Sequence, residues 1–165
     1  MSVETNIKLY PQRAEPAPGL TMTLTGPKLH GLRITESALH YHGSITIDAD
    51  ILDLAGLYVL EFVNIWNKCS GIRISTYLLP GTRGSGVVCL NGAAARSCQV
   101  GDEVIITSER SVSGGDLINP DHTFRHCSRV LTFVHEPRIN TVDQKMEYRL
   151  TTQKDGSAHF ELVNI

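Results

Sequence analysis

The sequence predicts a mainly β protein that folds as one small barrel with short helices. Short runs rich in Val, Ile and Thr recur along the chain, and these residue types favour strands. Turn-forming residues separate the runs, as at residues 67–71, 80–81 and 100–102. Because the runs are short and closely spaced, they favour a small barrel over a parallel α/β sheet. The length of 165 residues and the 41% hydrophobic content fit one domain with an ordinary core.

The elements follow in order from a polar N-terminal segment. Prolines and a glycine in residues 1–21 predict a mobile leader, and translation can start at Met1 or Met22 on the sequence alone. From residue 23 onward, alternating β-branched runs predict strands, with two short helices between them. The expected strands cover residues 29–35, 43–47, 63–66, 71–79, 86–90 and 103–107, and the expected helices cover residues 48–55 and 92–97.

The pattern weakens after residue 108. Residues 130–134, 148–152 and 159–163 are typical of strands. The segment 113–126 contains Gly114-Gly115 and Pro120, so we expect it to be irregular. This last third of the chain carries no recognisable chemical signal.

The composition excludes two classes of partner. A net charge of −2 provides no basic surface for nucleic acid. No stretch approaches the roughly 20 apolar residues of a membrane span. The N-terminus lacks the charged and apolar regions of a secretory signal. We therefore expect a cytoplasmic protein with no nucleic-acid and no membrane partner.

The cysteines and histidines give no metal pattern. The four cysteines lie far apart without a CxxC pair, which favours four buried free thiols over a disulfide framework or a zinc site. They are Cys69, Cys89, Cys98 and Cys127. His40 and His42 alternate on one expected strand but lack a third ligand at a recognisable spacing, so we expect no metal.

Two further motifs have structural explanations. Residues 81–86 resemble a phosphate-binding loop but lack dinucleotide spacing and a Lys-Ser/Thr ending, which favours a turn. Asp48, Asp50 and Asp53 resemble part of a calcium loop without its glycine and terminal glutamate. Asp48 is better explained as the N-cap of the helix expected over residues 48–55.

The dipeptide Gly43-Ser44 has two interpretations. Gly-Ser is above all a turn signal. It can also be a site of self-cleavage, because a serine Oγ lies close to the preceding carbonyl carbon and glycine tolerates strained backbone. Attack of Oγ on the Gly43 carbonyl, elimination and hydrolysis would leave residue 44 as a pyruvoyl group.

Six segments in register favour the second interpretation. They are Lys28-Leu29-His30, His40-Tyr41-His42-Gly43-Ser44, Ile65-Trp66-Asn67, Gly71-Ile-Arg73-Ile-Ser-Thr76-Tyr77, Arg83-Gly84-Ser85-Gly86 and Asn91-Gly92-Ala93-Ala94-Ala95. In these segments and their spacing, the chain resembles the pyruvoyl-dependent aspartate 1-decarboxylase family, which makes β-alanine for pantothenate biosynthesis. The resemblance covers residues 22–108 and continues more faintly to residue 140.

The resemblance implies a fold and an assembly. The fold is a double-psi β-barrel that forms a homotetramer with active sites between neighbouring subunits. It divides the chain into a leader (1–21), a barrel domain (22–140) and a C-terminal extension of unassigned role (141–165). Cleavage would separate residues 1–43 from residues 44–165. We expect the folded barrel to hold strained backbone before Ser44, at roughly 1–3 kcal/mol. Spontaneous cleavage and cleavage assisted by a maturation factor are both compatible with the sequence.

The resemblance also implies chemical roles. Ser44 would become the pyruvoyl group, which forms a Schiff base with the substrate amine and acts as an electron sink when carbon dioxide is lost. Tyr77 would reprotonate the resulting carbanion as a general acid. Lys28 and Arg73 would bind the substrate carboxylates. Without the resemblance, these three side chains fit a cross-strand tyrosine and two surface charges.

The remaining implied roles belong to the substrate loop and the pocket. Backbone amides of Gly92, Ala93 and Ala94 would hold the substrate, although Asn91-Gly92 also fits a hairpin turn. Thr76 would act in processing and in substrate contact, and Asn91 would orient groups near the new pyruvoyl end. Residues expected to line the pocket are His30, Tyr41 and Trp66.

Three residues depart from the family pattern. Pro27 before Lys28 favours extended geometry at Gly26. His42 replaces a valine or glutamate and either affects processing or points outward, and Thr82 replaces a glutamate. The leader and residues 141–165 lie outside the family core, and they leave the substrate as aspartate or another acidic amino acid of a secondary pathway. An unprocessed barrel that acts as a binding or assembly protein is the third alternative.

Overall fold

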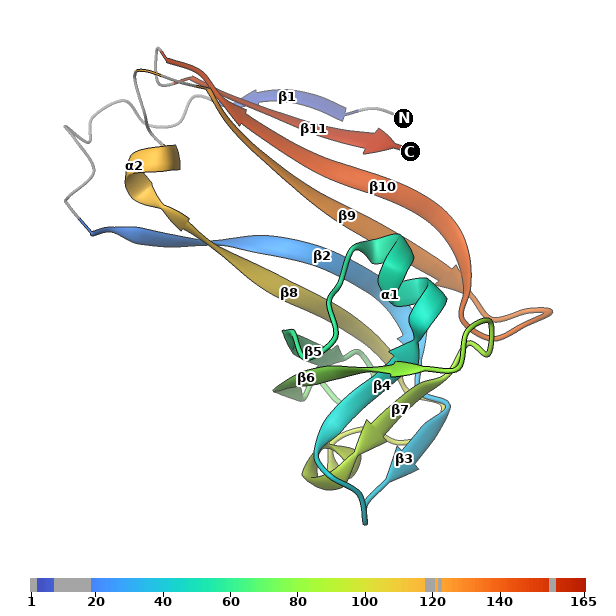
Figure 1. The fold of residues 1–165 in the computed structure, drawn as a ribbon. Helices are drawn as coiled ribbons and strands as arrows, with labels where there is room; N and C mark the ends of the chain where they lie inside the picture. Colours follow the sequence, from blue (N-terminus) through green and yellow to red (C-terminus); the bar gives the residue numbers. More distant parts are fainter. Residues whose placement is uncertain (1–2, 8–18, 118–120, 122, 155–156) are drawn as a thin grey trace. The chain divides into compact units, whose positions relative to one another are not determined.

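The structure is a computed structural model that describes residues 3–7, 19–117, 121, 123–154 and 157–165. Most of these residues lie in strands, and the helical elements are short: α1 (Ala49–Ala55), α2 (Gly114–Leu117) and the 3₁₀-helix η1 (Gly92–Arg96). Figure 1 traces the elements from the blue N-terminal strand to the red C-terminal strand. The predicted mainly β fold is confirmed.

The described strands belong to two compact units. In chain order they are β1 (Val3–Ile7), β2 (Thr21–Arg33), β3 (Glu36–Ala38), β4 (Ser44–Asp48), β5 (Phe62–Asn67), β6 (Arg73–Gly81), β7 (Val88–Asn91), β8 (Glu103–Ser113), β9 (Phe124–Val134), β10 (Thr141–Thr152) and β11 (Ala158–Asn164). The central unit comprises Pro27–Ser108 and Val130–Lys145. The terminal unit comprises Met1–Gly26, Glu109–Arg129 and Met146–Ile165.

The strands of the central unit pair in the order β9-β2-β8-β5-β6-β4-β7-β3. The pairing is mixed, because β4 runs parallel to β6 but antiparallel to β7, and β2 runs parallel to β9. Figure 1 shows β4, β6 and β7 side by side, with β3 next to β7. Parallel neighbours require crossover connections rather than hairpins. This crossed, mixed sheet is consistent with a small barrel-like fold.

Alternating side chains of these strands form the core of the central unit. Ile45, Ile47, Leu78 and Leu90 have no exposed surface. Burial of each such side chain contributes roughly 1.5–3 kcal/mol, and a one-residue slip of a strand would turn its apolar set outward. The core therefore fixes the register of β4 against β7, which places Ser44 opposite Asn91.

Helix α1 lies where the sequence predicts a helix. The Asp48 carboxylate accepts a hydrogen bond from the backbone N–H of Asp50 at 2.9 Å and caps the first turn. Gly56 follows the last turn with a φ of 74°, and its N–H donates to the carbonyls of Leu52 and Asp53. The predicted N-cap role of Asp48 is confirmed.

The terminal unit contains strands from both ends of the chain. β1 and β10 both pair antiparallel with β11, and the Thr152 hydroxyl donates to the Leu117 carbonyl at 2.9 Å. Residues 3–7 belong to the leader that we expect to be mobile, whereas the structure gives them a strand. The other leader residues 1–2 and 8–18 lie outside the described residues.

Three further features differ from the expectations. Strand β3 has largely exposed side chains, so no apolar alternation marks it in the sequence. Strand β8 continues past residue 107 to Ser113 with alternating exposed and half-buried side chains, because strand pairing is a property of the backbone. The segment expected to be irregular, 113–126, contains α2 and the start of β9, while residues 118–120 and 122 lie outside the described part.

The cysteine prediction is half wrong. All four cysteines are free, and Cys89 and Cys98 are buried as expected. Cys69 and Cys127 are exposed instead. Cys69 lies in the turn after β5, and Cys127 occupies an outward position in β9, where the alternation of a strand exposes every second side chain.

Candidate functional site

The Gly43-Ser44 peptide bond lies where an exposed segment enters a buried strand. Gly43 is exposed, whereas Ser44 begins β4 with 0% of its surface exposed. The φ of Gly43 is not in the left-handed region, and a Cβ built there would meet no atom within 4 Å. The expected strain before Ser44 therefore does not take the form of a left-handed glycine at residue 43.

The Ser44 hydroxyl is held by Asn91. These residues face each other in the antiparallel pair of β4 and β7, and Asn91 Nδ2 donates to Ser44 Oγ at 2.8 Å. Asn91 is only 4% exposed, so water does not compete freely for its amide. The resemblance implies that Asn91 orients groups near the new pyruvoyl end, and in the structure its amide contacts the Ser44 hydroxyl.

Gly92 packs against the backbone that precedes the bond. Its φ is 65°, and a Cβ there would lie 2.8 Å from the Tyr41 carbonyl oxygen and 2.9 Å from both Cα and N of Gly43. A side chain at this position is excluded by sterics as well as by conformation. Glycine at 92 thus lets η1 approach residues 41–43 directly.

The residues after Gly92 form a helical turn. Gly92 begins η1, so the hairpin turn that Asn91-Gly92 also fitted is not found. Ala93 is exposed, and Ala94 packs against the core of the central unit. The Tyr41 ring is 58% exposed and lies 5.9 Å from the His42 ring, edge to face, so residue 41 meets Gly92 through its carbonyl.

Strands β5 and β6 carry a second group of candidate residues. The register pairs Trp66 with Arg73, and the Arg73 guanidinium carbon lies 4.8 Å from the Trp66 ring centroid. Such a cation–π contact leaves the N–H edge of the guanidinium available to an anion. Tyr77 pairs with Phe62, with ring centroids 6.1 Å apart. Thr76, between the exposed Ser75 and the half-buried Tyr77, is buried.

Lys28 and His30 form a third group on β2. They are two residues apart, so they lie on the same side of the strand. Burial lowers the pKa of His30, and the charges of Lys28 and Lys68 lower it further, against a smaller opposite effect of Glu103. The neutral imidazole is therefore favoured at neutral pH.

The three groups are separate within one chain. Two strands, β8 and β5, lie between β2 and β6 in the sheet order. In the described part of the chain, no hydrogen bond, ion pair or ring contact joins Lys28 or Arg73 to Ser44. The structure thus brings Ser44 together with Asn91 and Gly92, but it does not gather the two predicted carboxylate-binding cations around them.

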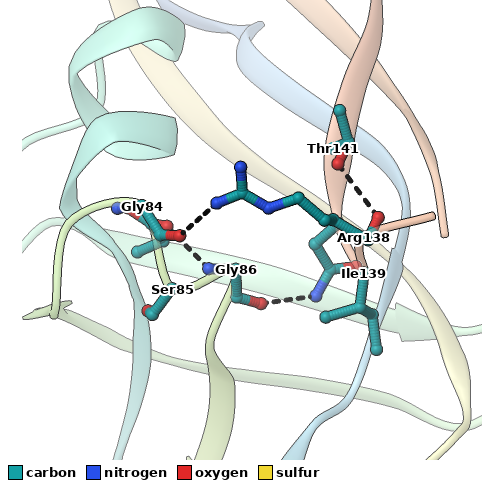
Figure 2. A pocket seen from close by; sticks show the side chains of 8 residues that line it. Gly84, Ser85, Gly86, Arg138, Ile139 and Thr141 are labelled. Atoms are coloured by element: carbon teal, nitrogen blue, oxygen red, sulfur yellow. Dashed lines mark hydrogen bonds between the residues drawn. The ribbon is translucent and has the colours of Figure 1, made fainter. Parts of the chain in front are cut away.

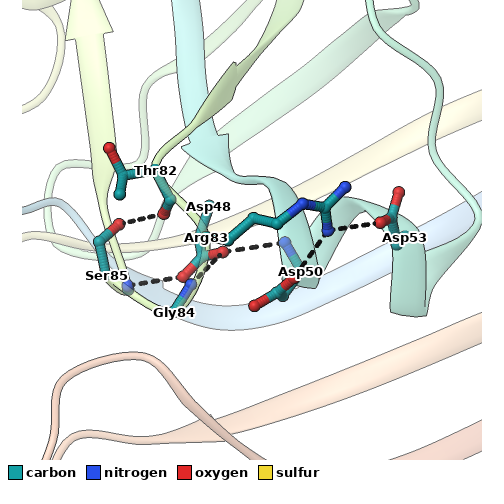
Figure 3. Close-up of polar contacts among 8 residues, drawn as sticks. Asp48, Asp50, Asp53, Thr82, Arg83, Gly84 and Ser85 are labelled. Carbon is teal, nitrogen blue, oxygen red and sulfur yellow. Dashed lines mark hydrogen bonds and ion pairs between the residues drawn. The ribbon is translucent and has the colours of Figure 1, made fainter.

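The loop at residues 81–86 binds a carboxylate of its own chain. The backbone N–H groups of Gly84 and Gly86 donate to Asp48 at 3.1 and 2.7 Å, and Arg83 contacts Asp50 and Asp53 at 2.7 Å each. Figure 3 shows these contacts between the loop and the first turns of α1. Because Asp48 occupies the amides, the loop is a structural turn, as the sequence favours, and not a phosphate cradle.

Two surface pockets do not include Ser44 in their lining. One, of about 420 Å³, is lined by residues that include Gly84–Gly86 and Arg138–Thr141. In Figure 2 the Arg138 side chain reaches across it to the Gly84 carbonyl at 3.4 Å. The other, also about 420 Å³, is lined by residues that include Glu36, Thr46 and Cys89. Neither pocket has Ser44, Lys28 or Arg73 in its lining.

The described residues hold neither a metal-ligating cluster nor a membrane-spanning helix. These residues contain no cluster of three or more His, Cys, Asp or Glu side chains placed to hold a metal ion. No helix among them is long and apolar enough to cross a membrane.

The chain is similar to a known family over most of its length. The family model described as aspartate decarboxylase matches residues 20–145. The aspartate 1-decarboxylase of Methylocella silvestris is 47% identical over 138 residues, which cover 84% of this chain and 82% of that protein. The aspartate 1-decarboxylase of Xanthobacter autotrophicus is 48% identical over 133 residues, covering 81% and 83% of the two chains. Aspartate 1-decarboxylase 2 of Mesorhizobium japonicum is 41% identical over 137 residues, covering 83% and 85%.

Proposed function

This chain belongs to the aspartate decarboxylase family, and we propose that it converts L-aspartate to β-alanine and carbon dioxide with a pyruvoyl group made from its own Ser44. The observation that carries the proposal is the fully buried Ser44 hydroxyl, which Asn91 holds at 2.8 Å beside the Gly43 peptide bond. A buried serine held by one defined donor is arranged as a nucleophile rather than as a solvated turn residue.

The cleavage uses atoms of residues 43 and 44 and one water molecule. Ser44 Oγ bonds to the Gly43 carbonyl carbon, the bond from that carbon to the Ser44 nitrogen breaks, and the hydroxyl proton ends on the released amine. Loss of the Ser44 Cα proton then breaks the Cβ–Oγ bond and frees the Gly43 carboxylate. Water hydrolyses the remaining enamine, with release of ammonia, and leaves the ketone at residue 44.

The residues around Ser44 fit this chemistry. The Asn91 amide limits the rotation of the Ser44 side chain, so the proposed nucleophile is held in one conformation. Gly92 lets the backbone of η1 approach residues 41–43, because a side chain there would overlap the Tyr41 carbonyl and Gly43. In this proposal Thr76 also assists processing.

The pyruvoyl ketone would supply an electron sink for the electron pair left when carbon dioxide departs. Tyr77 would donate the proton that replaces carbon dioxide, and its contact with Phe62 orients the phenol ring. Arg73 would bind one carboxylate with the guanidinium edge that its stacking on Trp66 leaves open. Lys28 would bind the other, beside a neutral His30. Thr76 and the amides of Gly92, Ala93 and Ala94 would contact the substrate, and Tyr41 would line the pocket.

We further infer that a second copy of the chain completes the site in a homotetramer. Within one chain two strands separate the Lys28 strand β2 from β6, so a neighbouring subunit is the simplest source of the second cation. An exposed apolar strip lies beside Tyr77: Tyr58, Leu60 and Phe62 are 73%, 64% and 69% exposed. Burial of such a strip between subunits would be favourable.

Intact-mass spectrometry of the purified protein tests the proposal. We expect two species, residues 1–43 and residues 44–165 with a pyruvoyl end, and one uncleaved species for Ser44→Ala. A folded wild-type protein that stays uncleaved both alone and after addition of a cell extract would refute the proposal. Cleavage only after addition of a cell extract would assign maturation to an accessory factor.

A second measurement separates the substrate from the cleavage. Aspartate, glutamate and methylaspartate are incubated with the cleaved enzyme, and carbon dioxide and the amine product are measured. We expect turnover of aspartate, and a cleaved but inactive Tyr77→Phe variant, because the phenol proton is lost. Preferred turnover of another acidic amino acid would overturn the assignment of aspartate.

A further inference from the structure

Besides Ser44, two further side chains contact the Asn91 amide, and no sequence motif marks either of them. Asn91 Nδ2 donates to Thr46 Oγ1 at 3.0 Å as well as to Ser44 Oγ. Cys89 Sγ donates to Asn91 Oδ1 at 3.4 Å, and the next oxygen in reach of the thiol, the Leu90 carbonyl, is farther away at 3.8 Å. The Asn91 amide thus has a partner for each of its two ends.

The strand register brings these side chains together. In the antiparallel pair of β4 and β7, Ser44 faces Asn91 and Thr46 faces Cys89. The four residues occupy alternate positions, so they share one side of the sheet, while Ile45 and Leu90 point into the core with 0% exposure. The polar cluster is therefore a fixed product of the same pairing that forms the core.

The partners decide which way the amide points. An asparagine side chain has an accepting end and a donating end, and a half-turn of its last torsion exchanges them. A thiol donates more readily than it accepts, and burial together with the charge of Glu36 raises the pKa of Cys89, which keeps its proton in place. With Oδ1 held by the thiol, Nδ2 is directed at the two hydroxyl oxygens.

We propose that Thr46 and Cys89 are positioning residues for self-cleavage, which hold the Asn91 amide in the orientation that donates to Ser44 Oγ. The inference rests on the proposed cleavage and adds two residues to it. Neither side chain touches the bond that breaks. Each acts through Asn91, so its loss frees the amide to rotate and lets Ser44 Oγ leave the position in which Asn91 holds it.

Four variants test the inference by loss and by rescue. Cys89→Ala removes the group that donates to Asn91 Oδ1, and Thr46→Val removes the hydroxyl that accepts from Asn91 Nδ2. Cys89→Ser and Thr46→Ser keep these hydrogen-bonding groups. Each precursor is made by cell-free synthesis, and its conversion is followed over time by intact mass. We expect cleavage to slow on the order of 10-fold or more in the first two variants and to stay within about 3-fold of wild type in the serine variants. Circular dichroism and melting temperature report folding.

Cys98→Ala provides the matched control. Cys98 is a second buried thiol, 1% exposed, in the core of the same unit, so its truncation leaves a similar cavity without touching Asn91. We expect wild-type cleavage in this variant. Wild-type rates in both Cys89→Ala and Thr46→Val, or equal slowing in the serine variants, would overturn the inference while the cleavage itself stands. A folded wild-type precursor that stays intact both alone and with a cell extract would overturn both.

Discussion

Gly92 determines at the residue scale how closely η1 can approach the bond proposed to be cut. An alanine Cβ there would overlap the Tyr41 carbonyl and Gly43, at 2.8–2.9 Å. We therefore expect Gly92→Ala to push residues 41–43 outward and to slow self-cleavage on the order of 10-fold or more. A time course of precursor conversion by intact mass measures the effect.

Gly71 offers a control for the conformational part of this prediction. Its φ is 76°, close to that of Gly92, but a Cβ there meets no atom within 4 Å. Gly71→Ala therefore also places an alanine in the left-handed region, at a cost of roughly 1–2 kcal/mol, but its Cβ overlaps no neighbouring atom. We expect wild-type cleavage from it. Equal slowing in both variants would show that general destabilisation, rather than contact with residues 41–43, is responsible.

His30 gives a pH-dependent prediction. Burial, Lys28 and Lys68 hold its pKa in the folded protein below the usual 6.5. The unfolded chain therefore binds more protons between these two pKa values, so this stability is present above pH 6.5 and is lost as the pH falls toward the folded pKa. We expect the melting temperature of wild type relative to His30→Gln to decrease between pH 7 and pH 5.

Nuclear magnetic resonance titration of the His30 ring checks the cause. We expect its midpoint below 6.5 and an upward shift in Lys68→Gln, because the variant removes a positive charge that disfavours the imidazolium. A midpoint at or above 6.5 in the wild-type protein would contradict the prediction.

Asp48 joins two elements, helix α1 and the loop at residues 81–86. Its buried carboxylate accepts from the backbone N–H groups of Asp50, Gly84 and Gly86. An unsatisfied buried donor costs roughly 1–3 kcal/mol, so Asp48→Ala should lower the free energy of unfolding by roughly 2–4 kcal/mol. Urea denaturation in a Ser44→Ala background, where the chain stays intact, measures the loss.

Arg83 is the control for the same loop. Its ion pairs with Asp50 and Asp53 are exposed to solvent. Exposed pairs contribute little, so we expect Arg83→Gln to leave the urea midpoint near that of the background. If Asp48→Ala also left the midpoint unchanged, its three hydrogen bonds would not stabilise the loop.

At the scale of the whole molecule, the proposed cleavage falls between strands that stay paired. β2 would belong to residues 1–43, whereas its partner β9 would belong to residues 44–165, with Lys28 opposite Val130 and His30 opposite Thr132. Leu29 and Leu32 of β2 have no exposed surface in the core of the central unit. We expect the two segments to stay together in native mass spectrometry and to separate only in denaturant.

A shortened chain tests which pairing holds the segments. β1 also pairs with β11 across the same division of the chain. Deletion of residues 1–18 removes β1 and leaves β2 intact, so we expect residues 19–43 to remain bound after cleavage. Release of that segment under native conditions would mean that β1 is needed to hold it.

The local elements of the central unit were predictable because their signals are short-range. Apolar alternation predicted β4, β5 and β6, and Asp48 with Gly56 bounds the predicted α1. The edge strand β3 and the far end of β8 were not predictable, since neither segment has a run of alternating apolar and polar residues. Their pairing depends on backbone groups of strands that are distant in sequence.

Some features of the candidate site could also be predicted from the sequence, whereas others depend on the tertiary structure. Gly43-Ser44, Asn91 and Gly92 could be named from ordered motifs, and with them the family and the chemistry proposed for this chain. Only the tertiary structure decided that Thr46 and Cys89 contact Asn91, that Gly92 rather than Gly43 is the sterically required glycine, and that Asp48 fills the loop at residues 81–86. The physical reason is that a motif records residue types along the chain. A hydrogen bond or a steric limit between β4 and β7 depends on the register that the packed core imposes.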